Sequence, residues 1–404
     1  MKESMANDAK LVGLGSLISS LSTYVFLIVA ARALGVEGFG EFSAFWGAFF
    51  LLAGLIGAID LEAARQVASN DDSTARTQKS LILAAGVVGL IATLAWILIS
   101  SLSLDADAGM LAIGVVGIWL VVPLGITRGS LIGAKFSSSY SKIIAGEGII
   151  RLFLAVLVFA TKSNSVLQFA ALTVAGMAIW IPWFKHVLPT KSEILFSESF
   201  KNLATLLVAS AGSALLLSGL PWIMSLNKSV NSEQLGILAS GLIISRIPIL
   251  AFSSVQALLI PYFVRGKKSQ STKSAISNFG ASLVFLIISV SLLLAYLIGP
   301  SLLMIFFGSS FVIESATFVI LFASSWVLVA HMLLVSKLIA NNSHTKAAAS
   351  WLIGAVMGSL MISNWATSVN QISLYVLTAS TMCLVSSFVL SKYDDTNQAN
   401  KESK

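Results

Sequence analysis

Long apolar stretches, each separated from the next by a short polar or Gly/Pro break, recur along the whole 404-residue chain. A bilayer core about 30 Å thick requires about 20 apolar residues per helix. The stretches are too long and continuous for β-barrel strands, which alternate over about ten residues. The sequence therefore predicts an all-α integral membrane protein with about twelve transmembrane helices. The predicted spans are 11–32, 39–60, 80–101, 109–132, 143–161, 165–185, 202–225, 235–260, 275–299, 314–337, 346–363 and 371–391.

The composition excludes a soluble protein, because only 11% of the residues are charged and 56% are hydrophobic. Soluble domains carry about 25% charged residues. The lone Cys383 excludes a disulfide framework, and His186, His331 and His344 lack ligand spacing, so we expect no metal or other cofactor. No Gly-rich lysine loop for ATP is present, and the loops are too short for a catalytic domain. We expect a transport protein, not an enzyme.

The basic residues test the twelve-span prediction. With the N-terminus inside, 20 of the 25 Lys and Arg residues fall in inner segments, Arg32, Lys162 and Lys228 fall outside, and Arg151 and Arg246 lie within spans. Cytoplasmic loops carry an excess of Lys and Arg, and a missed span would have inverted every later loop. We therefore predict a multi-pass protein of the cell inner (cytoplasmic) membrane with both termini cytoplasmic, whose basic loops contact anionic lipids and not nucleic acid.

An internal repeat divides the chain near its middle. Residues 37–44 (EGFGEFSA) and 233–240 (EQLGILAS) share the pattern Glu-x-apolar-Gly-x-apolar-small-small at an offset of 196 residues, and Arg32 and Lys228 match at the same offset. Six spans per half predict two six-helix bundles related by a pseudo-two-fold axis along the membrane normal. The predicted parts are an N-terminus (1–10), a first lobe (11–190), a cytoplasmic linker (191–201), a second lobe (202–391) and a disordered tail (392–404).

Three motifs resemble those of a known family. Residues 30–42 (AARALGVEGFGEF) resemble the first extracytoplasmic turn of polysaccharide and O-antigen flippases, which belong to the multidrug/oligosaccharidyl-lipid/polysaccharide (MOP) exporter superfamily. Residues 65–68 (RQVA) are similar to the basic end of that family's second helix, and residues 147–151 (EGIIR) to a Glu-x-x-x-Arg pattern of its fifth. The second half resembles the family mainly in architecture.

The resemblance implies a function. It implies export of undecaprenyl-diphosphate-linked saccharide units for surface polysaccharide synthesis, by alternating access between two lobes. A lipid-linked oligosaccharide is then the partner molecule. A polysaccharide polymerase or glycosyltransferases stay open as further partners, and we expect a monomer.

Charged residues within the spans are the candidate binding residues, because a charge at mid-bilayer is costly. Glu147 lies four residues before Arg151 on one helical face, so either the two form an internal ion pair or Glu147 orients Arg151 toward a cavity. Arg246 has no acid within helical reach, and Pro248 predicts a kink beside it. Arg246 therefore either faces water or an anion, or it snorkels or pairs with an acid on another helix. Arginine binds phosphate through two parallel hydrogen bonds, so Arg151 and Arg246 could clasp a diphosphate.

Two outer residues complete the candidate site. Arg32 and Lys228 form either a substrate exit station or, more simply, interfacial anchors. Gly129-x-x-x-Gly133 and Gly354-x-x-x-Gly358 predict close helix packing.

A cation-coupled multidrug exporter of the same superfamily is the main alternative. Such a protein requires buried carboxylates, whereas span 11–32 contains none and Asp60 and Glu62 lie near a predicted cytoplasmic helix end. The interior charge is cationic on balance, which favours anionic cargo. A channel would require a ring of charged residues, and a membrane glycosyltransferase would require a large outer loop. The sequence shows neither feature.

Overall fold

The computed structural model describes residues 2–69, 77–103, 107–190, 194–252, 275–341 and 343–402. Among these residues, eleven helices are long and apolar enough to cross a membrane. The first of them, Lys10–Ser69, covers two predicted spans, and the other ten each coincide with one. The predicted all-α architecture is therefore confirmed, and the chain is a multi-pass membrane protein.

Two of the predicted spans, 11–32 and 39–60, follow each other in one helical segment that is interrupted only at a single glycine. Helix α1 (Lys2–Ile56) contains Gly35 at φ 69°, a left-handed conformation that favours glycine. In a straight helix, Phe26 and Phe42 would lie about 24 Å apart at about 1.5 Å per residue. Their ring centroids lie 6.0 Å apart, and those of Phe26 and Trp46 lie 5.5 Å apart. Gly35 thus turns α1 back on itself, and its two halves pack as an antiparallel pair.

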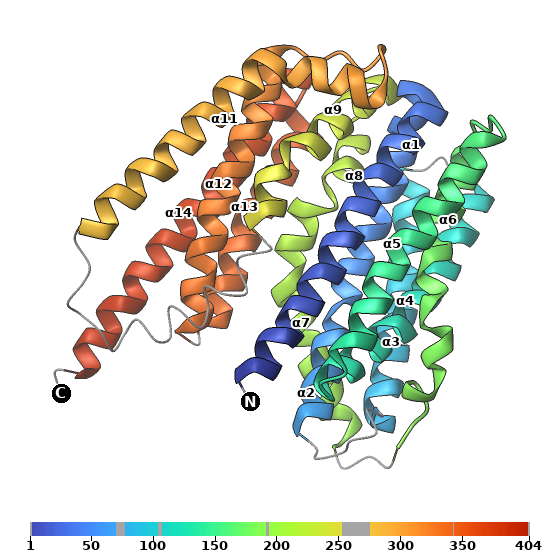
Figure 1. Cartoon of the computed structure of the whole chain (residues 1–404), viewed down its shortest axis with the longest axis vertical. Helices are drawn as coiled ribbons and strands as arrows, with labels where there is room; N and C mark the ends of the chain where they lie inside the picture. The colour runs from blue at the N-terminus through green and yellow to red at the C-terminus, as the bar shows by residue number, and fades with distance from the viewer. Residues whose placement is uncertain are drawn as a thin grey trace. The chain divides into compact units, whose positions relative to one another are not determined.

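The chain forms two compact units, which are described separately. The first, Met1–Leu226, holds α1 to α8 (Figure 1). Its core is aromatic, since Phe45 and Phe49 of α1 stack on each other and meet Trp96 edge-on. After α1 follow α2 (Ala58–Ser69), α3 (Lys79–Ser103), α4 (Ala108–Gly133), α5 (Ser137–Ala160), α6 (Val166–Ala175), the 3-10 helix η1 (Gly176–His186), α7 (Phe196–Leu217) and α8 (Leu220–Ser225).

The second unit, Asn227–Lys404, packs through glycines. A Cβ on Gly354 would lie 2.5 Å from the Ala379 carbonyl oxygen, and one on Gly358 would lie 2.4 Å from the Ala379 Cβ. The predicted packing role of this pair is thus confirmed, because only glycine admits so close an approach. The described helices of this unit are α9 (Ser232–Ser245), α11 (Ala275–Phe307), α12 (Ser315–Ala340), α13 (His344–Trp365) and α14 (Val369–Glu402).

Some predicted boundaries differ from those of the structure. The units divide at Leu226, not at the predicted linker 191–201. The predicted span 202–225 is broken at Ser218 and Gly219, between α7 and α8, where Pro221 cannot continue the preceding hydrogen-bond ladder. The predicted disordered tail 392–404 is helical up to Glu402, because no Gly or Pro interrupts it and each added residue extends the ladder by one bond.

The repeat and the membrane orientation stay predictions. At the offset of 196, Gly35 corresponds to Asn231, which caps the N-terminus of α9 through a reciprocal bond with Gln234. The first copy therefore turns at one glycine and the second uses a capped helix start. Several charges that carry the orientation prediction lie outside the described residues, namely Arg76, Lys191, Arg265, Lys267, Lys268, Lys273 and Lys404.

Candidate functional site

Four charged side chains from three helices of the first unit form one chain of ion pairs. Arg128 Nη2 of α4 donates to Asp60 Oδ2 of α2 at 2.5 Å. Arg128 Nη1 lies 3.7 Å from Glu147 Oε2 of α5. The other oxygen of that carboxylate, Oε1, accepts from Arg151 Nη2 at 2.7 Å. Two acids and two bases balance, so the network can lie within membrane-spanning helices without a net charge.

Close helix packing brings these charges together. A Cβ on Gly125 of α4 would lie 2.6 Å from Asp60 Oδ1, and one on Gly129 would lie 2.2 Å from the Asp60 carbonyl oxygen. A Cβ on Gly133 would lie 2.6 Å from the Ala64 carbonyl oxygen. Glycines on one face of α4 therefore let α2 approach its backbone, which confirms the packing role predicted for Gly129 and Gly133.

Arg151 is enclosed. Its side chain is 3% exposed, its Nε donates to the Thr173 carbonyl oxygen at 3.3 Å, and its guanidinium carbon lies 5.5 to 5.9 Å from the ring centroids of Phe26, Trp46 and Phe50. Aromatic faces attract a cation at such distances. Glu147 and the rings together hold the Arg151 charge in place.

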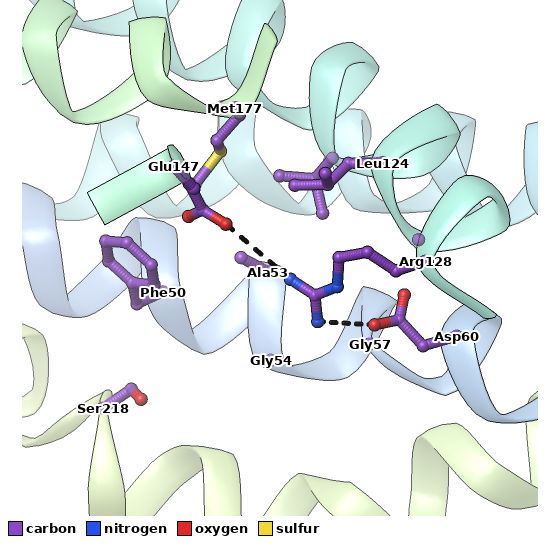
Figure 2. Close-up of a pocket in the computed structure, with 12 residues that line it drawn as sticks. Phe50, Ala53, Gly54, Gly57, Asp60, Leu124, Arg128, Glu147, Met177 and Ser218 are labelled. Carbon is purple, nitrogen blue, oxygen red and sulfur yellow. Dashed lines mark hydrogen bonds and ion pairs between the residues drawn. The ribbon is translucent and has the colours of Figure 1, made fainter. Parts of the chain in front are cut away.

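Arg128, in contrast, lines a cavity of about 200 Å³ within the first unit. Figure 2 shows Arg128 between Asp60 and Glu147, with Phe50 beside Glu147. The Arg128 side chain is 27% exposed, compared with 16% for Asp60 and 13% for Glu147. Its Nε is buried and has no hydrogen-bond partner among the described residues. Apolar and small residues complete the wall: Ala53, Gly54, Gly57, Val121, Leu124, Gly125, Met177 and Ser218.

The predicted site residues divide between the two units. The ion pair of Glu147 and Arg151 is confirmed, and it is the internal pair that was one of the two interpretations. Arg246 lies in the second unit, half-buried at the C-terminal cap of α9. The helix ends there because Pro248 cannot donate to the ladder, which confirms the predicted interruption. Arg32 and Lys228 are exposed. The binding roles of these five residues stay predictions.

Sequence reasoning missed Arg128 and treated Asp60 as a helix-end residue. The charge count assigns Arg128 to the cytoplasmic segments, although this residue falls inside the predicted span 109–132. An arginine within a span requires a partner, and Asp60 at the inner end of the predicted span 39–60 was available. That signal was present, but the two residues are 68 positions apart and no local spacing joins them.

In sequence, no protein-family model matches the chain. Its relatives include uncharacterized proteins of Mycobacterium tuberculosis and Mycobacterium bovis. Each is 26% identical over 366 residues, which cover 86% of this chain and 83% of the relative.

Solved structures share the fold. A multidrug resistance MATE family transporter of the MOP superfamily, in an inward-facing conformation, has a TM-score of 0.72 at 11% identity over 96% of both chains. An outward-facing conformation of such a transporter has a TM-score of 0.62 at 17% identity over 98% of this chain and 97% of the other. A third is a MOP superfamily transporter from Pyrococcus furiosus, described as having a binding pocket of reverse polarity. It has a TM-score of 0.62 at 14% identity, over 96% of this chain and 95% of the other. At these identities the likeness establishes the fold.

Proposed function

We propose that this chain is an exporter that moves a diphosphate-linked lipid saccharide across the cytoplasmic membrane by alternating access. The fold supports a transport mechanism of this kind, since it occurs in MOP superfamily transporters solved facing inward and facing outward. The sequence motifs at residues 30–42, 65–68 and 147–151 favour the saccharide branch of that superfamily.

The observation that carries the proposal is the Arg128 guanidinium at the wall of the cavity. It has five N–H donors, yet Nη2 alone makes a short bond, to Asp60, while Nη1 reaches Glu147 only at 3.7 Å. Phosphate oxygens accept hydrogen bonds in the planar, paired geometry that a guanidinium presents. A diphosphate entering the cavity can therefore use donors that the protein leaves unused.

Glu147 can give up its contact with Arg128 when a phosphate binds and regain that contact when the phosphate leaves. The Glu147 carboxylate bridges Arg151 and Arg128, and together with Asp60 it balances the charge of the two guanidiniums when no cargo is bound. A phosphate that takes the place of the Glu147 oxygen beside Arg128 keeps that guanidinium paired, while the other oxygen of Glu147 keeps its bond to Arg151. We therefore assign the first contact to Arg128, and to Arg151 the role of holding Glu147.

The other basic residues extend this path in the proposal. Arg246 is the candidate anion-binding residue of the second unit, and Arg32 and Lys228 form the exit station. The localisation in the cell inner membrane, the cytoplasmic termini, the monomeric state and the contacts with anionic lipids belong to the same proposal.

The second candidate function is export of an organic cation. It is favoured by the carboxylates of Asp60 and Glu147, both of which line the cavity beside Phe50. Each carboxylate already accepts from an arginine, at 2.5 Å for Asp60 and 2.7 Å for Glu147. A cationic drug would have to compete with a tethered guanidinium for each oxygen, whereas an anion meets free donors. The charge arrangement thus favours anionic cargo.

Proteoliposomes containing a fluorescent lipid-diphosphate oligosaccharide test the proposal. We expect Arg128→Gln to slow flipping by about tenfold or more, because one charge-assisted hydrogen bond contributes about 1.5–3 kcal/mol. Arg246→Ala and Arg151→Ala should also abolish flipping while leaving the protein inserted.

The matched control is Lys142→Ala, an exposed basic residue near the start of α5, which should flip at the wild-type rate. In parallel, the same vesicles are loaded with an organic cation dye. Dye efflux without lipid flipping would replace the proposed function with the second candidate. Normal flipping by the Arg128, Arg151 and Arg246 variants would refute the anion site.

A further inference from the structure

A buried polar network joins α7 to α2 and α3. The Glu62 carboxylate of α2 is 1% exposed, and its Oε1 accepts from Gln66 Nε2 at 2.9 Å and from Asn202 Nδ2 of α7 at 3.3 Å. Gln66 Nε2 also donates to Ser199 Oγ of α7 at 3.1 Å, and Ser199 Oγ donates to Ser80 Oγ of α3 at 3.3 Å. Arg65 of α2 also pairs with the Glu62 carboxylate, at 2.6 Å, so the charge itself is balanced within α2. Separating α7 would take the Asn202 and Ser199 partners from buried Glu62 and Gln66, so the network resists separation of these helices.

Further contacts join the chain on either side of α7 to the first unit. Before α7, the Ile194 amide donates to Gln78 Oε1 at 3.1 Å. After it, a Cβ on Gly47 of α1 would lie 2.8 Å from the Trp222 amide nitrogen of α8. Along α7 itself, a Cβ on Gly54 of α1 would lie 3.3 Å from the Ala214 Cβ. The segment from α7 to α8 is thus attached to α1, α2 and α3 along its length.

The next residue is attached to the other unit. Asn227 is 5% exposed, and its Nδ2 donates to the carbonyl oxygens of Ile362 at 2.7 Å and Ala366 at 2.8 Å, while its Oδ1 accepts from the Ser229 amide at 2.9 Å. Leu226, immediately before it, closes the last turn of α8. Attachment therefore changes from one unit to the other across a single peptide bond.

We propose that α7 and α8 move with the first unit during transport and that the hinge lies at Leu226–Asn227. In the predicted sequence repeat, the second half begins with α7. The proposed hinge therefore lies about one helix after the start of the second repeat. Hinges are a few residues at the ends of elements that absorb a change in backbone angles. The inference rests on the proposed alternating motion but not on the cargo.

Distances between spin labels on the full-length protein in lipid nanodiscs test this assignment. In a Cys383→Ala background, cysteines are introduced in pairs at exposed positions: Leu94 of α3, Val208 of α7 and Val385 of α14. We expect the Val208–Leu94 distribution to be at least about twofold narrower than Val208–Val385, because helices packed within one rigid body do not exchange between arrangements. If Val208–Leu94 is as broad as Val208–Val385, or broader, the assignment is overturned.

A matched pair of variants tests the network itself. Asn202→Ala removes the bond to Glu62 and should broaden the Val208–Leu94 distribution. Thr205→Ala on the same helix removes an exposed hydroxyl that bonds only its own helix, at the Lys201 carbonyl oxygen, and should leave that distribution unchanged. Equal distributions in the two variants would show that the network does not hold α7. These measurements require no cargo, so their failure is distinguishable from failure of the flipping assay.

Discussion

Glu62 and Arg151 are buried in the first unit, whereas no Asp, Glu, Lys or Arg side chain is fully buried among the described residues of the second unit. The buried polar groups there are mainly serine hydroxyls. Ser373 and Ser380, for example, donate to the carbonyl oxygens of Val369 and Val376 one turn earlier in their own helix. Glu62 and Arg151 pair with Arg65 and Glu147 of their own helices, and each also bonds a neighbouring helix, Glu62 to the Asn202 amide of α7 and Arg151 to the Thr173 carbonyl oxygen of α6, so they join helices to one another. A hydroxyl satisfied within its own helix fixes nothing and permits close packing.

The largest expected effect is that of Arg128→Ala. It leaves Asp60 and Glu147 facing the cavity without that guanidinium, and should lower the free energy of unfolding by about 3 kcal/mol, the low end for a buried pair, because Arg128 is 27% exposed. Denaturation in detergent micelles measures the loss. Asp60→Asn combined with Arg128→Ala should recover part of it, and a single variant as stable as the wild type would contradict the ion-pair network.

A matched pair of glycines compares close packing in the two units. Gly129→Ala in the first unit and Gly354→Ala in the second should each destabilise by about 1–3 kcal/mol, because a Cβ meets backbone oxygen. We expect the larger loss for Gly129→Ala, since it also displaces Asp60 from Arg128. Thermal unfolding measures both.

The control for this pair is Gly86→Ala in α3, where a Cβ meets nothing within 4 Å. It should be neutral or slightly stabilising, because alanine favours a helix. Equal losses at all three glycines would argue against a packing effect specific to Gly129 and Gly354.

Asn227→Leu challenges the comparison, because Asn227 is a polar group of the second unit that does bond to another helix. Its loss leaves the carbonyl oxygens of Ile362 and Ala366 without this donor, and should cost about 1–3 kcal/mol. Hydrogen exchange should accelerate at the end of α13. Unchanged exchange there would mean that these carbonyls do not depend on Asn227.

The smallest effect is expected for Ser380→Ala. Its hydroxyl bonds its own helix at Val376, so the change should stay below about 0.6 kcal/mol, the average for hydrogen bonds between membrane helices. A loss as large as that of Asn227→Leu, measured in the same detergent, would remove the distinction drawn here between the two kinds of polar group.

Sequence alone predicted the features that depend on local order. Hydropathy located the spans, the four-residue spacing located the pair of Glu147 and Arg151, and Pro248 marked the interruption beside Arg246. Each of these follows from neighbours along the chain. The predicted pairing of Arg151 with Arg246 around a diphosphate is not tested by either unit taken alone.

The remaining features depend on contacts between distant segments. Asp60 meets Arg128 because glycines on α4 admit α2, and neither hydropathy nor charge spacing specifies which faces of two spans meet. The attachment of α7 to the first unit through Asn202 and Glu62 is hidden for the same reason. A repeat in sequence indicates how the chain arose, and it does not determine which helices hold together.

The distance along the chain between Asp60 and Arg128 has a consequence for biogenesis. The two residues are 68 positions apart. At about 5–20 residues per second, synthesis takes roughly 3 to 14 s to cover that interval. Asp60 therefore leaves the ribosome several seconds before Arg128, its guanidinium partner, has been synthesised. The nascent helix therefore has to be sheltered from lipid, by the insertion machinery or by a bound proton, until α4 arrives.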